Sequence, residues 1–328
     1  MTKIFVTRQF PGTAIEKLSK QKGFEVSVYK KDQIIPRKEL LKRVKGADII
    51  LSLLTDRIDA QVMDAAGDQL KMIANYAVGF DNIDIEEAKR RKIRVINTPC
   101  DQSTESVAEH AIAMIFGLAH RLIEADNFTR AKKYKGWDPG LMLGSGLSGK
   151  TIGVIGAGRI GYSISKRLYD GFGVKIIYND IKRNTKYEKD FKAKLRTKTQ
   201  LLKEADIVTL HVPLLKATHH LISTKELKAM KKTAFLINTS RGPVVDETEL
   251  IKALKNGDIA GAGLDVYECE PKIDCNPRDK FELRKMPNVI LTPHTASATI
   301  EARDAMGQIA LKNILAFTNN KRLPNKIA

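Results

Sequence analysis

Cysteine is scarce in this 328-residue sequence, and its pattern excludes the chemistry that cysteine usually supplies. The three cysteines, Cys100, Cys269 and Cys275, are odd in number and show no C-x-x-C spacing. We therefore expect neither a disulfide framework nor a zinc site. Such cysteine usage is typical of proteins in a reducing compartment, so we expect a cytoplasmic protein.

Long uninterrupted apolar runs are also lacking. The first ten residues contain a short strand-like run instead of a cleavable signal. The most apolar helix candidate, residues 107–122, carries Glu109, His110 and Arg121, which is typical of a buried helix and not of a bilayer span. We therefore expect no membrane association. The 328 residues are enough for two domains with separate cores.

Acidic residues are fewer than basic ones: the sequence has 38 Asp and Glu and 56 Lys and Arg, which gives a net charge of +18. A basic surface attracts phosphate, so nucleic-acid binding has to be weighed. The basic residues are spread along the whole chain, however, and the densest stretch, residues 182–198, is interleaved with Glu188 and Asp190. No nucleic-acid module is recognisable, so we expect no nucleic-acid partner but a solvated lysine-rich surface that can steer anionic substrates.

The most informative stretch is residues 151–180, which reads as strand, glycine-rich turn, helix and second strand. Gly156, Gly158 and Gly161 have the spacing G-x-G-x-x-G, and Asp180 follows Gly161 by nineteen residues at the end of the second strand. These glycines allow a tight turn, close approach of a pyrophosphate and helix packing, while the helix N-terminus attracts phosphate. A carboxylate at this strand end accepts both ribose hydroxyls, which favours NAD over NADP.

Alternating strand and helix signals predict an α/β protein with two doubly wound parallel-sheet domains. Ligands bind such sheets beyond the carboxyl ends of the strands, so the loops at 53–55 and 76–79 are candidates for a site. The expected strands are 3–7, 25–29, 48–53, 70–75 and 94–97 in the first half, and 152–155, 174–178, 205–213, 233–242, 259–271 and 288–294 in the second.

Residues 98–150 interrupt this rhythm. Ser103 or Thr104 can cap the apolar helix that follows Pro99, and a glycine-rich stretch with the single tryptophan, Trp137, comes after that helix. An irregular arm with an aromatic anchor suggests a contact between subunits. The alternative is a surface loop that tucks Trp137 into its own domain.

The later strand ends supply groups suited to hydride transfer onto a carbonyl. Asp180, Pro213, Arg241, Asp265, Glu270 and His294 all follow apolar runs and are expected to open toward one crevice. His294 can give and take a proton near neutral pH, and Glu270 can orient its imidazole. Arg241 can bind a carboxylate through two parallel hydrogen bonds.

Several motifs resemble the signature regions of the D-isomer-specific 2-hydroxyacid dehydrogenase family. They are GAGRIG with Asp180, INTSRGPVVDE, GAGLDVYECEP and LTPH, in this order. NYAVGFDNIDIEEA (75–88), VINTP (95–99) and WDPGLMLG (137–144) are most similar to the glyoxylate/hydroxypyruvate reductase branch. The resemblance implies a homodimer in which a Rossmann NAD-binding domain (99–291) is inserted into a flavodoxin-like substrate domain (1–98 plus 292–328).

The resemblance also implies roles for individual residues. Arg241 would bind the substrate carboxylate and keto oxygen, His294 would be the acid/base and Glu270 its partner. Val78 and Gly79 would offer backbone amides to the substrate, with Leu53 nearby, and Trp137 would reach the active site of the neighbouring subunit. The cofactor would be lined by Thr104, Gly156, Gly158, Arg159, Ile160, Gly161, Asp180, Val212, Pro213, Thr239, Ser240, Arg241, Asp265 and His294, and no metal is expected.

The sequence also departs from the family pattern. Similar archaeal glyoxylate reductases often carry Ser-Arg where this chain has Asn179-Asp180, a change that suits NADPH. Asp180 would repel a 2′-phosphate, so NADH is expected, although Lys182 and Arg183 are close enough to weaken the preference. Residues 274–280 look like a small insertion, and DQSTES (101–106) is closer to other members of the family, including phosphoglycerate dehydrogenases, so the identity of the substrate stays open.

The expected function is NAD(H)-dependent reduction of small 2-keto acids to D-2-hydroxy acids, with glyoxylate or hydroxypyruvate as substrate. The same scaffold could instead serve D-lactate, 3-phosphoglycerate, formate or phosphite. A different alternative is an NAD-sensing interaction protein, because C-terminal binding protein corepressors keep this fold. No long disordered tail for partner binding is visible in the sequence, which counts against that alternative.

Overall fold

The computed structural model describes residues 1–270 and 282–328, and the expected insertion at 274–280 lies outside these residues. The chain divides into two compact units. We call Met1–Ser103 with Ala298–Ala328 the terminal unit and Thr104–Ser297 the central unit. Both divisions fall a few residues further along the chain than the boundaries expected at 98/99 and 291/292.

The terminal unit is built on a five-stranded parallel sheet in the order β2-β1-β3-β4-β5. Ile4 and Val6 belong to one hydrophobic core and Phe5, between them, belongs to the other, because successive residues of a strand face opposite sides. Its elements are β1 (Thr2–Val6), α1 (Ala14–Lys20), β2 (Phe24–Val28), α2 (Arg37–Arg43), β3 (Ile49–Leu53), α3 (Ala60–Ala66), β4 (Met72–Tyr76), α4 (Ile85–Arg90), β5 (Arg94–Ile96) and α13 (Ile300–Thr318).

The central unit has a seven-stranded parallel sheet in the order β12-β11-β10-β9-β6-β7-β8. Strand order reverses between β6 and β9, which makes their carboxyl ends the place where a ligand crevice is expected. Its elements are α5 (Asp101–Ala119, which starts before the boundary), α6 (Leu122–Arg130), β6 (Thr151–Ile155), α7 (Arg159–Phe172), β7 (Lys175–Asn179), α8 (Thr185–Phe191), β8 (Lys194–Leu195), α9 (Lys198–Glu204), β9 (Ile207–Leu210), α10 (Thr224–Ala229), β10 (Phe235–Asn238), the 3₁₀ turn η1 (Gly242–Val244), α11 (Glu247–Asn256), β11 (Gly261–Leu264) and β12 (Val289–Leu291).

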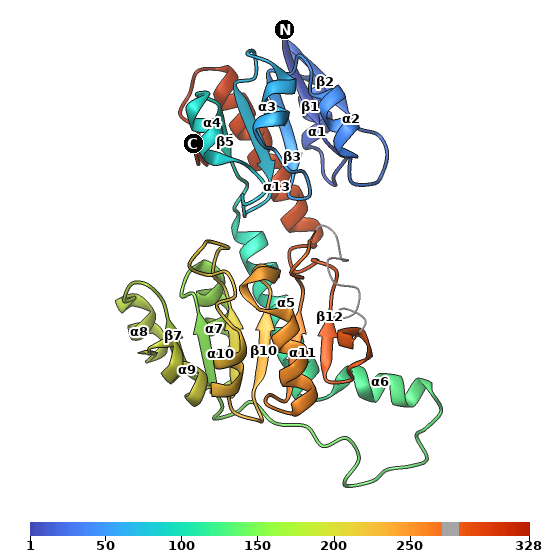
Figure 1. The fold of residues 1–328 in the computed structure, drawn as a ribbon, viewed down its shortest axis with the longest axis vertical. Coiled ribbons are helices and arrows are strands. Elements are labelled where there is room, and N and C mark those ends of the chain that lie inside the picture. Colours follow the sequence, from blue (N-terminus) through green and yellow to red (C-terminus); the bar gives the residue numbers. More distant parts are fainter. Residues whose placement is uncertain (271–281) are drawn as a thin grey trace. The chain divides into compact units, whose positions relative to one another are not determined.

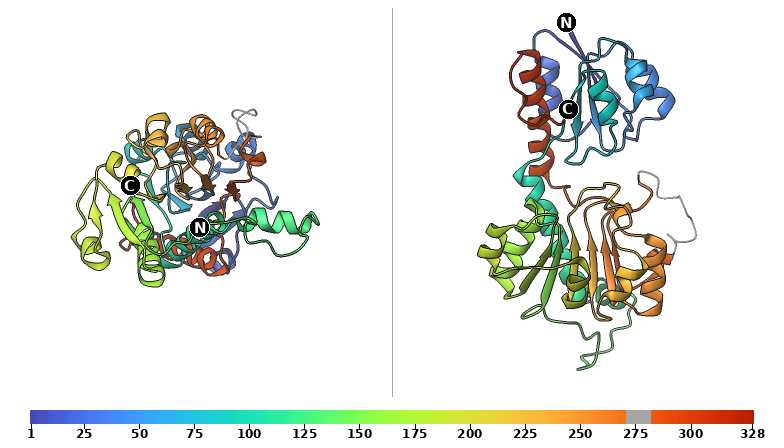
Figure 2. Two further views of the ribbon diagram at one scale, coloured as in Figure 1. Left: turned by 90° about the horizontal axis from the view of Figure 1, so that it is seen from below. Right: turned by 60° about the vertical axis from the view of Figure 1, so that its left-hand side comes forward.

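The predicted fold class is confirmed, because each unit has a parallel sheet with helices on both faces (Figures 1 and 2). In the central unit one core contains residues of α9, α10 and α11, and the other contains residues of α5, α7 and α8. Strand β8 was not predicted, since it has only two residues, both exposed, and therefore leaves no apolar run in the sequence.

Helix α5 supplies apolar residues to the core of the central unit, among them Ala108, Ala111 and Ile115. Within the described residues, no single helix is long and apolar enough to cross a membrane. Helices α5 and α6, which are bent by 62° relative to each other, reach the length and apolar composition of a membrane span only when they are counted together.

The cysteines differ from the expectation in one respect. Cys100 is a buried thiol outside any disulfide, and its Sγ accepts a hydrogen bond from the N–H of Ser103 at 3.3 Å, but Cys269 takes part in a disulfide. The structure therefore contains a disulfide that the odd cysteine count and the spacing had not indicated. The reason is that disulfide formation depends on the separation of the two Cα atoms in space, which spacing along the chain does not fix.

Candidate cofactor and active site

The three glycines of the turn after β6 and the first turn of α7 differ in the space around them. Gly156 has a φ of +98°, and a Cβ there would lie 2.4 Å from the carbonyl oxygen of His211. A Cβ on Gly161 would lie 2.3 Å from the carbonyl oxygen of Gly156. At Gly158, by contrast, a Cβ would meet nothing within 4 Å. The first and third glycines are required for packing, and the second leaves the N-terminus of α7 open to an approaching pyrophosphate.

Asp180 follows β7 and is bonded directly to the glycine loop. Its Oδ2 accepts a hydrogen bond from the backbone N–H of Ala157 at 2.8 Å, and its Oδ1 accepts one from the N–H of Ile181 at 2.7 Å. An ionised carboxylate has about four acceptor positions, so each oxygen can accept one further bond. Asp180 therefore lies beside the glycine loop with the capacity to accept two ribose hydroxyls.

Two buried side-chain atoms, His211 Nδ1 and Thr239 Oγ1, have no hydrogen-bond partner in the part of the chain that the structure describes. They follow β9 and β10, which are paired so that Leu210 is opposite Asn238. Leaving a buried polar atom unpaired costs about 1–3 kcal/mol, so such atoms are typical of a surface that a ligand completes. The residues at this edge of the sheet thus fit a dinucleotide.

His211 is half-buried as a residue, but its Nδ1 is fully buried, and its Nε2 is 2.8 Å from the hydroxyl of Thr209. Burial lowers the pKa of this imidazole from 6.5 to about 3, because the charged form would lose its hydration. His211 is therefore neutral at physiological pH. Nothing in the sequence singled out this residue beyond its place at a strand end.

The loop after β10 is organised by Asn238, which is buried. Its Oδ1 accepts hydrogen bonds from the N–H (3.0 Å) and hydroxyl (2.8 Å) of Ser240, and its Nδ2 donates to the carbonyl of Arg241 at 2.9 Å. The next residue, Gly242, packs so closely that a Cβ would lie 1.8 Å from the carbonyl carbon of Tyr267. This contact places Arg241 next to the segment that leads to Glu270.

His294 and Glu270 form a close pair. Nδ1 of His294 lies 2.5 Å from Oε2 of Glu270, whose Oε1 accepts a hydrogen bond from the N–H of Tyr267 at 3.0 Å. Because Nδ1 is engaged, Nε2 is the ring nitrogen that can exchange a proton with a substrate. His294 has a φ of +54°, a conformation that costs energy for a residue with a side chain and is common at functional sites.

Asp265 holds the loop that carries His294. Its side chain is completely buried: Oδ1 accepts from the Thr292 hydroxyl (2.5 Å) and the Thr295 N–H (2.8 Å), and Oδ2 accepts from the Ala296 N–H (2.8 Å). Its carbonyl oxygen also accepts from the N–H of His294 at 2.8 Å. The Asp265 carboxylate therefore binds the 292–296 loop of its own chain and holds that loop in place.

The remaining predicted residues are distributed over both units. Arg159 and Ile160 begin α7, Val212 and Pro213 follow β9, and Thr104 is the first residue of the central unit. Leu53, Val78 and Gly79 belong to the terminal unit, where Leu53 ends β3 and the other two follow β4. Asn97 Nδ2 donates to the carbonyl of Val78 at 2.7 Å, and Asn75 Nδ2 donates to that of Gly79 at 2.9 Å.

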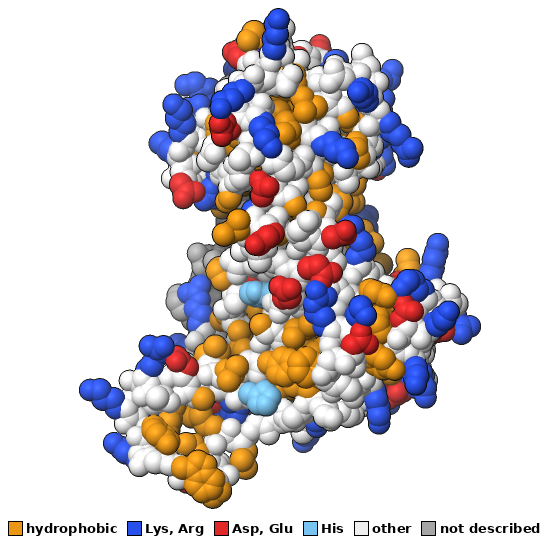
Figure 3. All heavy atoms as spheres, turned by 180° about the vertical axis from the view of Figure 1, so that it is seen from behind, with side chains coloured by type: hydrophobic (Ala, Val, Ile, Leu, Met, Phe, Trp, Pro, Cys, Tyr) orange, Lys and Arg blue, Asp and Glu red, His pale blue; other side chains and the backbone are white. Residues whose placement is uncertain are grey.

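Trp137 lies in the segment between α6 and β6, and 82% of its surface is exposed. The alternative that it tucks into its own domain is therefore wrong. Leu143 (70% exposed), Leu122 (54%) and Tyr134 (54%) are further exposed hydrophobic residues of α6 and this segment. Figure 3 shows hydrophobic side chains gathered on this part of the central unit.

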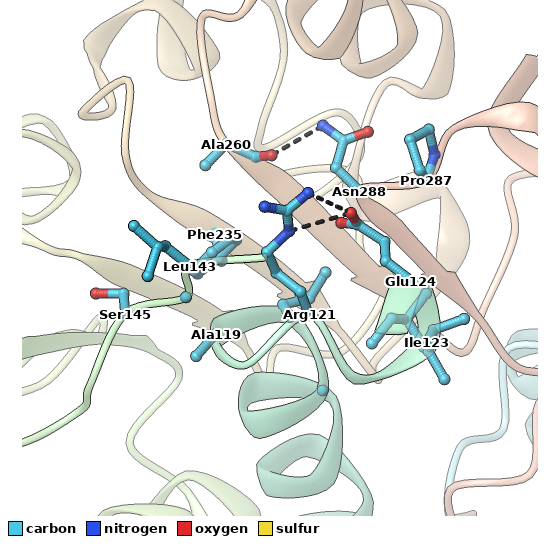
Figure 4. Close-up of a pocket in the computed structure, with 14 residues that line it drawn as sticks. Ala119, Arg121, Ile123, Glu124, Leu143, Ser145, Phe235, Ala260, Pro287 and Asn288 are labelled. Atoms are coloured by element: carbon cyan, nitrogen blue, oxygen red, sulfur yellow. Dashed lines mark hydrogen bonds and ion pairs between the residues drawn. The ribbon is translucent and has the colours of Figure 1, made fainter. Parts of the chain in front are cut away.

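A cavity of about 370 Å³ lies in the central unit away from these residues (Figure 4). Phe235 and Asn288 line it from the amino ends of β10 and β12, the edge of the sheet opposite the glycine loop. Arg121 and Glu124 form an ion pair of 2.6 Å at its wall. This cavity is therefore separate from the candidate site.

The sheet of the central unit, its glycine loop and the neighbouring polar strand ends define a dinucleotide-dependent oxidoreductase. The chain belongs to the D-isomer-specific 2-hydroxyacid dehydrogenase family: the model "D-isomer specific 2-hydroxyacid dehydrogenase, NAD binding domain" matches residues 112–296. The predicted family is confirmed, and with it an NAD-dependent oxidoreductase that acts on small 2-hydroxy or 2-keto acids.

Curated relatives and solved structures agree with this assignment. The glyoxylate reductase of Thermococcus litoralis is 46% identical, with 99% of this chain and 96% of that protein aligned, and that of Pyrococcus furiosus is 44% identical, with 99% and 95% aligned. The TT0316 protein from Thermus thermophilus superposes with a TM-score of 0.91 at 39% identity over 100% of both chains. A D-lactate dehydrogenase from Aquifex aeolicus, complexed with NAD and lactic acid, gives 0.87 at 29% over 99% of each.

The packing of the glycine loop predicts opposite effects for two substitutions in α7. Gly161→Ala should lower the free energy of unfolding by about 1–3 kcal/mol and weaken NADH binding, because the methyl group must push α7 away from Gly156. Gly171→Ala, whose Cβ would meet nothing within 4 Å, should be neutral or stabilise by about 0.5–1 kcal/mol. Urea unfolding and NADH fluorescence titration measure both. Equal behaviour of the two variants would contradict the steric argument.

The buried His211 predicts a pH dependence of stability. Because its pKa falls from 6.5 unfolded to about 3 folded, its contribution is complete above pH 6.5 and is lost as pH falls toward 3. Between pH 7 and 5 the wild type should lose about 2 kcal/mol that the His211→Gln variant keeps. Urea unfolding at both pH values tests this, with replacement of the exposed His219 by Gln as the control. Identical pH slopes for wild type and His211→Gln would disprove it.

Proposed function

We propose that this chain is an NAD(H)-dependent reductase that converts small 2-keto acids to D-2-hydroxy acids, with glyoxylate or hydroxypyruvate as its substrate. The observation that carries the proposal is the 2.5 Å pair of His294 and Glu270 in the unit that holds the NAD-binding fingerprint. The relatives named glyoxylate reductase, aligned over 99% of the chain, support this substrate class and favour it over an NAD-sensing interaction protein.

The three catalytic residues have complementary tasks. The hydride for the keto carbon would come from NADH bound beside the glycine loop. His294 Nε2 donates the proton that the resulting alkoxide needs, and Glu270 keeps the imidazole oriented and balances its positive charge in the protonated form. Arg241 binds the substrate carboxylate through two parallel hydrogen bonds and draws charge toward the keto oxygen.

We propose the same cofactor contacts that the sequence predicts. The N-terminus of α7 would hold the pyrophosphate through the glycine loop, and Asp180 would accept the ribose hydroxyls, which selects NAD over NADP. Asp265 lines the cofactor in the family pattern, and its bonds to the 292–296 loop give it a second task, to position His294. The other proposed contacts are Thr104, Arg159, Ile160, Val212, Pro213, Thr239, Ser240 and Arg241.

The loops after β3 and β4 would supply substrate contacts, so the terminal unit would act as the substrate domain and the central unit, which carries His294, as the NAD-binding domain. The carbonyl of Val78 is held by Asn97. Because a trans peptide points its C=O and N–H in opposite directions, this bond turns the N–H of Gly79 away from Asn97. That amide and the one of Val78 would bind the substrate carboxylate, with Leu53 beside it.

We further propose a cytoplasmic homodimer in which the exposed segment after α6 is covered by a second copy of the chain. The 82% exposure of Trp137 and the 70% exposure of Leu143 support this, because large exposed apolar groups clustered on one segment mark an association surface. Trp137 would then contribute to the substrate site of the neighbouring subunit.

The test of the proposed function is a panel of 2-keto acids run with NADH and with NADPH. We expect oxidation of NADH with glyoxylate and hydroxypyruvate, and weaker activity with pyruvate and phenylpyruvate. NADPH should be a poorer cofactor because Asp180 repels its 2′-phosphate. A protein that oxidises no NADH with any member of the panel would refute the proposal.

The different roles proposed for His294 and Arg241 predict different kinetic defects when each is replaced. His294→Ala should lower kcat by about 10²–10⁴-fold with the affinity for NADH kept, because only proton transfer is lost. Arg241→Ala should also lose activity with cofactor binding largely retained, and should show the larger rise in KM for the keto acid. Replacement of the exposed His120 by Ala is the control. Unchanged turnover in His294→Ala would remove it as the acid/base.

A further inference from the structure

Arg183 lies in the loop between β7 and α8, three residues after Asp180. Its guanidinium faces the carboxylate of Glu188 with Nε at 3.1 and 3.0 Å from the two oxygens and Nη2 at 2.8 Å from Oε2. The sequence alone presents Arg183 as a cation beside the ribose site. In the structure both Glu188 oxygens are turned toward this cation and form an ion pair with it.

Glu188 is held in place by a buried neighbour. The hydroxyl of Tyr178, whose residue is completely buried, donates to Oε1 of Glu188 at 2.9 Å and accepts a bond from the N–H of Asn184 at 2.9 Å. The pKa of Glu188 is lowered, first by the Arg183 guanidinium and then by the Tyr178 hydroxyl, so the carboxylate stays ionised at neutral pH. An exposed ion pair contributes little by itself, but this one has two-point geometry and a buried anchor.

The same loop is tied to the glycine loop at a single residue. Asp180 accepts from the N–H of Ala157 at 2.8 Å, and the side chain of Asn184 donates to the carbonyl of Ala157 at 3.2 Å. The Oδ1 of Asn184 also caps α8 by accepting from the N–H of Tyr187 at 3.0 Å. Residues 180–184 are thus fixed at both ends beside the ribose position, and Arg183 lies between these two anchors.

We propose that Glu188 is a specificity-determining residue, which acts by withholding Arg183 from the 2′-phosphate of NADP. The inference rests on the proposed function for the ribose contact of Asp180. A guanidinium binds phosphate in a two-point geometry, so a released Arg183 would favour NADP. Selection of NAD then has two parts: Asp180 repels the phosphate, and Glu188 removes the cation that would attract it.

The test measures binding of NADP⁺ and NAD⁺ by isothermal titration calorimetry, with 2′,5′-ADP and 5′-AMP as probes of the phosphate alone. In the wild type, repulsion of the 2′-phosphate by Asp180 would hide any attraction by Arg183. The affinities are therefore compared in an Asp180→Ser background. Adding Glu188→Gln should tighten NADP⁺ and 2′,5′-ADP binding by about tenfold, the value of one charge-assisted phosphate contact, with NAD⁺ and 5′-AMP changed less than about twofold. Gln keeps an acceptor for Tyr178, so the fold is retained.

Two controls assign the effect. Adding Arg183→Ala to the double variant should abolish the gain. Asp170→Asn removes the same charge from another ion pair, with Lys166 at 2.7 Å, near the far end of α7 from the glycine loop, and should give no gain for NADP⁺.

The proposal is overturned if Glu188→Gln leaves NADP⁺ affinity unchanged, or if the gain survives Arg183→Ala, which would assign it to Lys182 or to net charge. These readouts need no turnover. A failure of the keto-acid panel would therefore refute the proposed reaction while leaving the binding comparison to decide the role of Glu188.

Discussion

The candidate site depends on the tight backbone packing of the glycine loop, which makes two close contacts. Gly156 lies against the carbonyl of His211, and Gly161 against the carbonyl of Gly156, with no room for a Cβ at either position. This packing brings the N-terminus of α7, the end of β7 with Asp180 and the end of β9 to one place. The geometry expected of a dinucleotide site is therefore possible only because both positions are glycine, which has no Cβ.

A second constraint is the satisfaction of buried charge. The carboxylate of Asp265 is completely buried, and the hydrogen bonds it accepts come from the 292–296 loop. A buried carboxylate without such bonds would be strongly destabilising, so these bonds restrain the loop. His294 is placed by that loop in a left-handed backbone conformation that residues with a Cβ adopt only rarely. The position of His294 and the stability of this loop therefore depend on the same bonds.

Much of the fold was predictable from the sequence, because buried parallel strands leave apolar runs and the helices between them leave amphipathic segments. The predicted strands of both units have counterparts in the structure, whereas the exposed strand β8 left no signal and was missed. The disulfide at Cys269 was also missed, because residue spacing does not report distance in space. At the site, Arg241, Glu270 and His294 were recognisable as polar residues after apolar runs, but Asn238 and His211 were not singled out.

The sequence by itself determined the βαβ unit, the glycine spacing and the family, since these depend on local steric and hydrophobic patterns. Only the tertiary structure decided which partners the polar strand-end residues bond to. It turned the carboxylate of Asp265 to the 292–296 loop, left Nδ1 of His211 without a partner among the described residues and paired Arg183 with Glu188. The outcomes at Asp265 and His211 depend on strand order and register, which bring together residues far apart in the chain. Arg183 and Glu188 are close in the chain, and their pairing depends on how the loop between β7 and α8 folds.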